Sequence, residues 1–397
     1  MYRGATIGVV VPAYNEEEFV GDVIETVPAF VDRVYVVDDC STDGSWNEIR
    51  ETFGKLDGSQ PTHDGVRPVT DGAGAIADGT GAIADGAGGV ADGGGVRWRD
   101  RIVAHDVRDG SGRPDRRFVA FRHRENAGVG GAIKTGYRNA MNDPADVDVV
   151  AVMSGDGQMD PTILDRIIDP VVRGDADYAK GNRLRHTDFR REMSTWRTFG
   201  NFLLTGLTRV ASGYWRMMDP QNGYTAISRR ALDRVEFESL YEDYGFCNHL
   251  LVRLNRQRLR IADVSMKAVY GDETSYIRYE TFVPALSLLL LRGYLGRLLD
   301  ADGHGLGEPT AAAQLLGMGA IVGGVGVGAL FPLLPAATST GGILVLVGLV
   351  SFLTGVVGEK RRNVDLEVRA DSGGPPWKPR IESEEVPPRD DPPAREE

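Results

Sequence analysis

Apolar runs and amphipathic segments alternate along the first half of the chain, and this pattern predicts an α/β sheet. The run at 6–11 reads TIGVVV, which is short, β-branched and typical of a strand. Apolar residues then recur at helical spacing between about 17 and 30, and a second apolar run at 34–37 ends in two aspartates. A turn at 40–45 leads into another predicted helix. The order strand, helix, strand, helix is typical of a doubly wound sheet.

The stretch at 147–161 reads VDVVAVMSGDGQMDP and extends this pattern. Its nearly continuous apolar start predicts a strand buried on both faces of a parallel sheet. Two glycines then allow a sharp turn that presents Asp156 and Gln158 beyond the strand end, and Asp160 and Pro161 fit the cap and first position of a helix. Because open α/β sheets bind ligands at the carboxyl ends of their strands, this oxygen-rich turn suits a hard cation that holds a diphosphate. A loop with a capping aspartate explains the stretch equally well.

Further strands are predicted at 117–121, 177–183 and 259–264, and a helix begins near 241–246. A glycine-rich turn at 126–132 precedes a helix that ends near Met141. Such a turn can approach phosphates, although close packing of helix and strand is its commoner use.

A segment rich in Gly, Ala and Asp interrupts the pattern at about 57–95. It contains a seven-residue repeat, which reads GAIADGT, GAIADGA and GGVADGG. Glycine at this density prevents a helix, and the apolar content is too low to offset the entropy of ordering. The segment is therefore predicted to be a disordered surface insertion in a catalytic domain that covers 1–275.

The last third of the chain is much more apolar. Residues 282–299 are apolar but interrupted by Arg292 and Arg297, which predicts an amphipathic helix over 280–300 that lies in a membrane interface. From 309 to 358 no residue is charged, so two membrane spans are predicted at 311–333 and 341–357 with a turn at 335–340. A buried helical hairpin in a soluble protein is the weaker alternative.

The residues after the second predicted span indicate the topology. A basic flank, Lys360 to Arg362, favours a cytoplasmic carboxyl side, and two spans then leave the N-terminal domain cytoplasmic as well. The Pro-rich, acidic segment at 363–397 is predicted to be a disordered tail. The N-terminus shows no basic region followed by an apolar core, so no signal peptide is predicted.

Composition narrows the partners and the compartment. The 397 residues carry a formal net charge of -12, which argues against general nucleic-acid binding. Lysine is scarce and aspartate abundant, a balance that suits a halophilic cytoplasm, where salt screens the acidic surface. Cys40 and Cys247 form no close metal-ligand motif and fit a reducing compartment.

Six blocks occur in an order that resembles one enzyme family. They read VVVPAYNEE, VVDDCSTDGS, ENAGVGGA, MSGDGQMDP, GNR and DPQNGYTA, and they span roughly 6–270 without the insertion. The ordered set resembles the family 2 glycosyltransferases of the A-type fold, particularly the polyprenyl-phosphate sugar transferases related to dolichol-phosphate mannose synthase. The resemblance implies a nucleotide-sugar-binding α/β sandwich with a mostly parallel sheet, and transfer of a sugar from a UDP- or GDP-sugar with inversion at the anomeric carbon.

The resemblance also implies roles for residues of the first two blocks. By this comparison Pro12, Tyr14 and Glu16 line the base and ribose of the nucleotide, and Asp39 accepts a hydrogen bond from the base with Asp38 alongside. A carboxylate can accept an N–H from uracil or guanine, which agrees with this role. Core packing of Tyr14 and turn formation by the aspartate pair are the structural alternatives.

The family's metal motif usually reads Asp-x-Asp-x-Gln, and here the first aspartate is Ser154. The matching metal ligands are therefore Asp156, which is also the expected catalytic carboxylate, and Gln158. Ser154 could bind the ion through its hydroxyl or through water. The resemblance implies Mg²⁺ or Mn²⁺, both of which suit oxygen ligands.

Two arginines and one further aspartate complete the candidate site. Arg183 matches the basic residue that contacts lipid phosphate in relatives, and Arg197 is a second candidate for that role; a surface arginine is the alternative for both, and the better one for Arg197. Relatives that glycosylate hydroxyls carry Glu-Asp at a helix start with the aspartate as general base, and Glu242-Asp243 fits this pattern. Since a lipid phosphate is already anionic and needs no base, Asp243 could equally be a helix cap.

These observations predict a membrane-anchored inverting glycosyltransferase with a cytoplasmic catalytic domain and a polyprenyl phosphate as acceptor. The first alternative is transfer to a glycan or lipid hydroxyl with Asp243 as base. The second is a non-catalytic membrane scaffold that retains the fold, for which Ser154 is the only support. The chain lacks the Gln-x-x-Arg-Trp motif of processive polysaccharide synthases.

Overall fold

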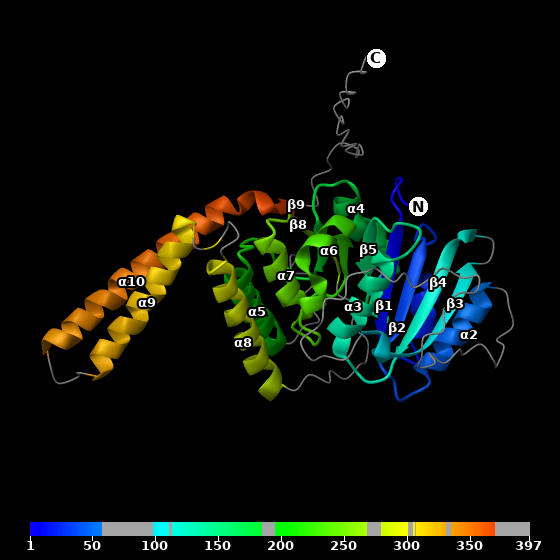
Figure 1. The fold of residues 1–397 in the computed structure, drawn as a ribbon, viewed down its shortest axis with the longest axis horizontal. Helices are drawn as coiled ribbons and strands as arrows, with labels where there is room; N and C mark the ends of the chain where they lie inside the picture. The colour runs from blue at the N-terminus through cyan, green and yellow to red at the C-terminus, as the bar shows by residue number, and fades with distance from the viewer. Residues whose placement is uncertain are drawn as a thin grey trace, which may run out of the picture.

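A computed structural model describes residues 1–57, 98–110, 113–184, 195–267, 279–300, 305, 307–330 and 335–369. The described part consists of an α/β domain from which a long helical hairpin projects (Figure 1). Most of the insertion predicted at about 57–95, and the tail beyond 369, lie outside the described residues.

The described strands form one sheet of nine, in the order β3-β4-β2-β1-β5-β7-β6-β8-β9. All neighbours pair in parallel except at β3 and β7, which run antiparallel to the others. We call β3, β4, β2, β1 and β5 the N-terminal half of the sheet and β7, β6, β8 and β9 its C-terminal half. The strand bounds are β1 Ile7–Ala13, β2 Arg33–Asp38, β3 Ile102–Gly110, β4 Arg113–His123, β5 Val149–Val152, β6 Tyr178–Asn182, β7 Thr225–Ser228, β8 Ile261–Ser265 and β9 Glu367–Arg369.

Helices cover both faces of this sheet, as the continuous apolar runs predict. Val9 and Val11 of β1 belong to the core under α1, α2 and α4, while Val10 belongs to the core under α3, α6 and α7. Both sides of the strand are therefore buried. The helix bounds are α1 Val20–Thr26, α2 Ser45–Asp57, α3 Gly128–Met141, α4 Leu164–Val172, α5 Thr195–Ser212, α6 Arg229–Val235, α7 Phe246–Arg256, α8 Tyr279–Leu298, α9 Pro309–Leu330 and α10 Pro335–Arg362.

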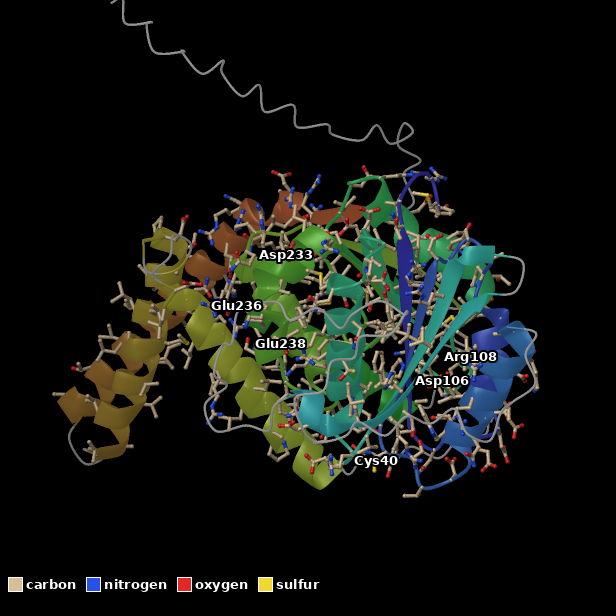
Figure 2. The ribbon with its side chains drawn as sticks, turned by 45° about the vertical axis from the view of Figure 1, so that its right-hand side comes forward. Cys40, Asp106, Arg108, Asp233, Glu236 and Glu238 are labelled. Atoms are coloured by element: carbon tan, nitrogen blue, oxygen red, sulfur yellow. The ribbon has the colours of Figure 1, made fainter. Side chains whose placement is uncertain are left out.

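The parallel strands end at one edge of the sheet, which we call the carboxyl edge. Cys40, two residues after β2, marks this edge at the bottom of Figure 2, whereas Asp233 of α6 lies toward the opposite end. The loops after β1, β2, β5 and β6 all leave from the carboxyl edge. The candidate residues that follow these strands in the sequence therefore lie on one side of the domain.

The structure corrects several sequence-based boundaries. Strands β3, β7 and β9 were not predicted, and α1 covers only part of the helix predicted from 17 to 30. Residues 335–340, predicted as a turn, are the start of α10. Residues 363–369, predicted as the start of a disordered tail, form a 3-10 turn and then β9, because a polar tripeptide can still complete a sheet edge when its backbone pairs with β8.

Helices α9 and α10 pack closely along their length. A Cβ at Gly317 or Gly324 would come within 2.6 Å of the α10 backbone, so glycine is required for this approach. Among the described residues, two helices are long and apolar enough to cross a membrane by length and composition, Pro309–Leu330 and Thr338–Arg362. Their outward side chains, such as Leu316 and Val322, are each 72% exposed.

Helix α8 joins the α/β domain to this hairpin. Its inward residues Leu286 and Leu290 pack in a core with Val252 of α7, while Leu288 and Leu291 on other sides of the helix remain exposed. Both sides of α8 are thus apolar, in contrast to the amphipathic helix predicted over 280–300.

Arg297 of α8 does not reach a surface, although the sequence predicted that its charge interrupts an interfacial helix. It is 5% exposed and forms an ion pair with the buried Glu359 of α10. Its Nε donates to the carbonyl of Ala211 at 3.0 Å, and Gln314 of α9 donates to Glu359 at 3.2 Å. Burial lowers the pKa of Arg297 to about 10, which leaves the side chain charged at neutral pH. This pair therefore fixes the hairpin to the α/β domain.

Candidate active site

The loops after β1 and β2 form one wall of the carboxyl edge. Asn15 Oδ1 accepts the Thr42 amide at 2.8 Å, and the Asn15 amide donates to Ser41 Oγ at 2.9 Å. The Glu16 amide donates to Ser45 Oγ at 2.8 Å. These reciprocal bonds bring together the first two sequence blocks, which hold the predicted nucleotide-binding residues.

The three residues predicted to line the nucleotide lie in this wall. Tyr14 is 42% exposed, so the ring is available to a ligand and core packing does not explain it. Pro12 is buried within β1, and its carbonyl accepts the Gly155 amide at 2.9 Å. Pro12 therefore joins the wall to the loop after β5, and Glu16 lies partly buried beyond it.

Asp39 is held by a set of partners that the sequence did not reveal. Its Oδ1 lies 2.7 Å from Nδ1 of His123 and accepts the Ala127 amide at 2.9 Å. Nε2 of His123 lies 2.9 Å from Thr135 Oγ1 on α3, so the imidazole bridges β4 to α3. Because His123 and the Ala127 amide both engage Oδ1, Asp39 is oriented firmly at the end of β2.

The Asp38 side chain is held inside the turn that follows β2. It is fully buried, its Oδ2 pairs with Arg122 Nε at 3.1 Å, and its Oδ1 accepts the Ser41 amide at 3.1 Å. Burial raises the pKa of Asp38 above its usual value. The side chain therefore braces the turn after β2, which is the structural alternative, and its place beside the nucleotide stays a prediction.

The glycine-rich turn before α3 packs against protein backbone. A Cβ on Gly130 would lie 2.6 Å from the Tyr241 carbonyl oxygen, and one on Gly128 the same distance from that of Glu242. The Gly131 amide donates to the Glu242 carbonyl at 3.0 Å. These glycines admit the backbone of the 241–243 loop, so close packing against this loop, and not against a strand, accounts for them.

Hydrogen bonds hold the Glu242 side chain in place, whereas the Asp243 side chain is exposed to solvent. Glu242 Oε1 accepts from Lys134 Nζ and from Arg101 Nη1, each at 2.9 Å. Burial opposes ionisation of Glu242, but the hydrogen bonds and charges of Lys134 and Arg101 together outweigh burial, and the pKa of Glu242 lies below its usual value. Asp243 is exposed, and its carboxylate accepts the Tyr244 amide at 2.7 Å. It does not cap α7, whose N-cap is Gly245.

The turn after β5 carries the candidate metal ligands. Asp156 Oδ1 accepts the Gln158 amide at 3.0 Å, which folds the turn, and Gly157 has a φ of 71°. Asp160 accepts the Thr162 amide at 2.8 Å as the cap of a 3-10 turn with Pro161 first, as predicted. No cluster of three or more His, Cys, Asp or Glu side chains suited to a metal occurs among the described residues.

This donor set still fits one type of divalent-cation site. Mg²⁺ commonly binds through one or two carboxylates and completes its coordination with water and substrate phosphates. Asp156 supplies one partly buried carboxylate, and Ser154 and Gln158 supply a hydroxyl and an amide oxygen on the same turn. The chain thus offers a partial oxygen site that a diphosphate can complete.

Arg183 stands at the end of β6 in a firm ion pair. Its Nε and Nη2 donate to the two carboxylate oxygens of Asp219 at 2.8 and 3.0 Å, and its amide donates to the same carboxylate at 3.0 Å. Asp219 is buried, which opposes its ionisation. The charges of Arg183 and Lys180 and the hydrogen bonds from Arg183 together outweigh burial and lower the pKa of Asp219 below its usual value. The guanidinium plane is therefore fixed. The described side chains do not include that of Arg197, which lies in α5.

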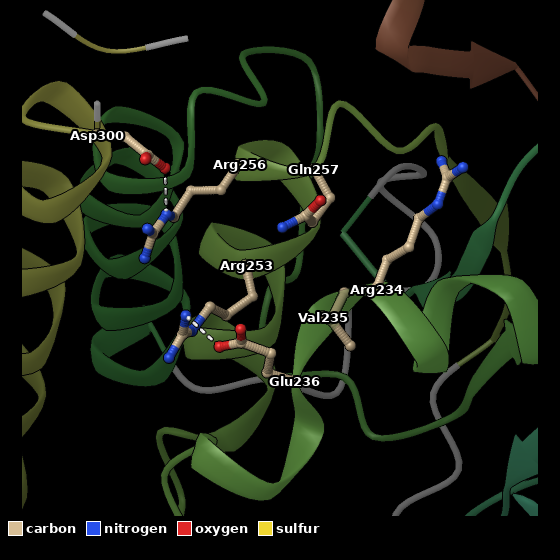
Figure 3. A pocket seen from close by; sticks show the side chains of 7 residues that line it. All are labelled: Arg234, Val235, Glu236, Arg253, Arg256, Gln257 and Asp300. Carbon is tan, nitrogen blue, oxygen red and sulfur yellow. Dashed lines mark hydrogen bonds and ion pairs between the residues drawn. The ribbon is translucent and has the colours of Figure 1, made fainter. Parts of the chain in front are cut away.

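A cavity of about 190 Å³ lies away from this site, at the far end of α7 (Figure 3). Arg253 pairs there with Glu236, and Arg256 pairs with Asp300. Since Asp243 precedes the start of α7 and both arginines lie in its last turn, this cavity is separate from the carboxyl edge.

Comparison with known proteins decides the family. The model of Glycosyl transferase family 2 matches residues 8–63 and 101–236, a range that includes the strands from β1, apart from its first residue, to β7. This chain carries a family 2 glycosyltransferase domain. The match resumes only after 100, so most of the predicted insertion lies outside the family domain.

Two archaeal proteins are similar in sequence. The chain is 28% identical over 186 residues to a UDP-N-acetylglucosamine–dolichyl-phosphate N-acetylglucosaminyltransferase of Methanococcus voltae, covering 46% of this chain and 72% of the relative. It is 26% identical over 154 residues to an uncharacterized protein of Methanocaldococcus jannaschii, covering 39% of this chain and 62% of the relative. Together with the family domain, these similarities support an enzyme.

Among solved structures, glucosyl-3-phosphoglycerate synthase from Mycobacterium tuberculosis, in complex with Mn²⁺ and UDP, is similar in fold. The TM-score is 0.42 and the identity 19%, over 76% of this chain and 82% of that one.

Proposed function

We propose that this glycosyltransferase transfers a sugar from a nucleotide-sugar to a polyprenyl phosphate with inversion, on the cytoplasmic face of a membrane. The observation that carries the proposal is the position of Arg183. It lies at the carboxyl edge in the C-terminal half of the sheet, and the same half receives β9 directly after α10. A phosphate-binding arginine thus belongs to the half that is attached to the apolar hairpin.

In this proposal each half of the sheet binds one of the two substrates. In the N-terminal half, Tyr14, Glu16 and Asp39 would bind the nucleotide, because Asp39 is oriented to accept an N–H from uracil or guanine. In the C-terminal half, Arg183 would bind the acceptor phosphate through its guanidinium. The Methanococcus voltae relative, whose name specifies a UDP-sugar and dolichyl phosphate, supports this division.

Mg²⁺ or Mn²⁺ would be held by Asp156, with oxygen atoms of Gln158 and Ser154 beside it. When bound, the ion supplies positive charge to the diphosphate that leaves with the nucleoside. The chain's own groups hold the donor in the wall after β1 and β2 and hold the acceptor phosphate at Arg183. An ionised phosphate needs no base, so Asp243 is not required for this reaction.

The sheet supports the proposed membrane topology. Because β9 pairs with β8, both ends of the hairpin lie on the side of the α/β domain, which supports two spans and a multi-pass protein of the cell membrane. A reporter fused after Arg369 should score cytoplasmic, and one inserted near Ser339 should score external. An external score for the fusion after Arg369 would exclude this topology.

The direct test of function uses membranes that contain the protein, a panel of labelled UDP- and GDP-sugars, and polyprenyl phosphate. We expect label in the lipid extract with one donor and none with Asp156→Asn. Label that appears in glycan or in a neutral glycolipid would favour the alternative acceptor, a hydroxyl activated by Asp243. That alternative has support in the structure, since Glu242 is anchored and Asp243 is presented at the edge.

A further inference from the structure

The loop at 213–219 leads from α5 toward β7 and ends at Asp219, the partner of Arg183. Successive backbone N–H groups of this loop converge on two carboxylates. Glu367 accepts three of them at 2.6–2.8 Å, from Trp215, Arg216 and Met217. Asp263 of β8 accepts the next, from Met218, at 2.8 Å. Consecutive amides that surround an anion form a nest, and here the anion is supplied by the protein itself.

The carbonyl groups of the same loop are also fixed. The fully buried Lys180 donates from Nζ to the carbonyls of Met218 and Asp219, the latter at 3.1 Å. These bonds hold Asp219 at a φ of 48°, a conformation that a residue with a Cβ adopts only when its surroundings enforce it. The direction of the Asp219 carboxylate therefore depends on how the loop backbone is held.

Glu367 comes from the part of the chain that follows the hairpin. It opens β9, where it pairs with Ile261 of β8. Asn363, between α10 and β9, is fully buried and donates to the Gly213 carbonyl at 3.0 Å. The segment that returns from the hairpin thus contacts the loop at its first residue and again at its centre.

We propose that Glu367 is a positioning residue for the acceptor site: its carboxylate fixes the 213–219 loop, and through Asp219 it sets the direction of Arg183. The hairpin's return strand would in this way contribute to binding the acceptor phosphate, although it contacts no substrate. The part of this inference that concerns the acceptor rests on the proposed function of Arg183.

The kinetic test uses the full-length protein with Glu367→Ala, Glu367→Gln and, as a matched control, Asp365→Ala, which removes an exposed carboxylate from the same segment. Loss of a partner to buried amides should raise the KM for polyprenyl phosphate about tenfold in Glu367→Ala. The KM for the nucleotide-sugar should change by less than about twofold, and Glu367→Gln should recover part of the loss because it keeps an oxygen acceptor. An unchanged acceptor KM, or equal changes in both KM values, would overturn the proposal.

A second measurement does not depend on the acceptor. Hydrogen exchange of the peptide spanning 214–219 should quicken at least about tenfold in Glu367→Ala, while exchange in β1 and β2 stays as in the wild type. If the wild type transfers no sugar to polyprenyl phosphate, the proposed function fails, and exchange still decides whether Glu367 holds the loop. Unchanged protection of 214–219 in Glu367→Ala would refute the positioning role.

Discussion

The two halves of the sheet are built in different ways. The N-terminal half takes its parallel strands from βα units joined by covering helices, and its core is apolar apart from charged groups such as Asp38 and Asp39, which are buried at a strand end. The C-terminal half gathers four short strands from segments spread between 178 and 369. Ion pairs with one buried partner connect its segments, notably buried Lys180 with Asp263 at 2.9 Å and Arg183 with buried Asp219.

This difference has a functional meaning. Apolar packing supplies stability but little direction, whereas a buried ion pair with its hydrogen bonds fixes geometry at a cost in desolvation. In the proposed function, contacts with His123 and the Ala127 amide orient Asp39 for the nucleotide, and an ion pair with the buried Asp219 orients Arg183 for the acceptor phosphate. We therefore expect variants in the N-terminal half to affect donor chemistry, and variants in the C-terminal half to affect acceptor binding and stability together.

The largest effect should come from the N-terminal half. Asp156→Asn removes the carboxylate of the candidate cation site and should lower kcat about 10³-fold, which corresponds to about 4 kcal/mol of transition-state stabilisation. Steady-state transfer assays measure this, and Asp233→Asn, an exposed change on α6, should stay within about twofold of wild type. If Asp156→Asn retained a tenth of the activity, Asp156 would not be the essential ligand.

The junction between α8 and the hairpin should show the cost of a buried charge. Arg297→Met leaves Glu359 buried without its main partner and should destabilise the protein by about 3–5 kcal/mol. The double variant Arg297→Met/Glu359→Met should recover most of this loss, because two apolar side chains replace the pair. Denaturant unfolding in detergent measures both values. A double variant no more stable than the single one would show that the pair is not the relevant interaction.

Asp219→Asn tests the acceptor side of the comparison. The change removes the charge that pairs with Arg183, so the guanidinium is held less firmly. The KM for the acceptor should rise roughly 10- to 100-fold, with the KM for the donor unchanged. The opposite pattern, a change in donor KM alone, would remove Arg183 from the acceptor site.

The same variant should show a characteristic pH dependence. Since the folded pKa of Asp219 lies below the ordinary 3.8, its ion pair stabilises the protein above that value and is lost as the pH falls through the folded pKa. The melting temperature of wild type should therefore exceed that of Asp219→Asn at pH 7, and the difference should shrink in acid. A constant difference at all pH values would mean that ionisation of Asp219 is not involved.

Asp243→Asn separates the two acceptor classes. With a lipid phosphate the nucleophile is already ionised, so the rate should fall by less than about fivefold. With a hydroxyl acceptor, the loss of a general base should cost roughly 10²–10⁴-fold. Transfer rates at saturating donor, with donor affinity measured in parallel, distinguish the two.

The smallest effect is expected from the insertion. Replacing the segment at about 57–95 by a short linker should leave transfer within about twofold, because a segment of low apolar content adds little to a core. The interruption of the family match in this region agrees with that expectation. Loss of donor binding in the deletion, in protein that still folds, would place the segment in the site.

Sequence reasoning worked best where one segment determines its own structure. The continuous apolar runs predicted β1, β2 and β5, since burial on both faces leaves a clear local pattern. It failed for β3, β7 and β9. β9 has only three residues, and its place depends on the backbone of β8.

Partners across long distances in the chain were equally hidden. His123 lies 84 positions from Asp39, Asp219 lies 36 from Arg183, and Glu367 lies 150 from Met217. A local pattern carries no information about such pairs. Arg297 shows the same limit, because a charge inside an apolar run indicates a surface until its partner, 62 residues later, is known.

The position of β9 also constrains how the protein is made. The ribosome must complete both candidate spans before Glu367–Arg369 exists, so β8 remains an unpaired edge while the hairpin is synthesised. Insertion of the hairpin into the bilayer would hold that edge apart from other nascent chains. The proposed acceptor site would then be assembled last, and only in molecules whose hairpin has already been inserted into the bilayer.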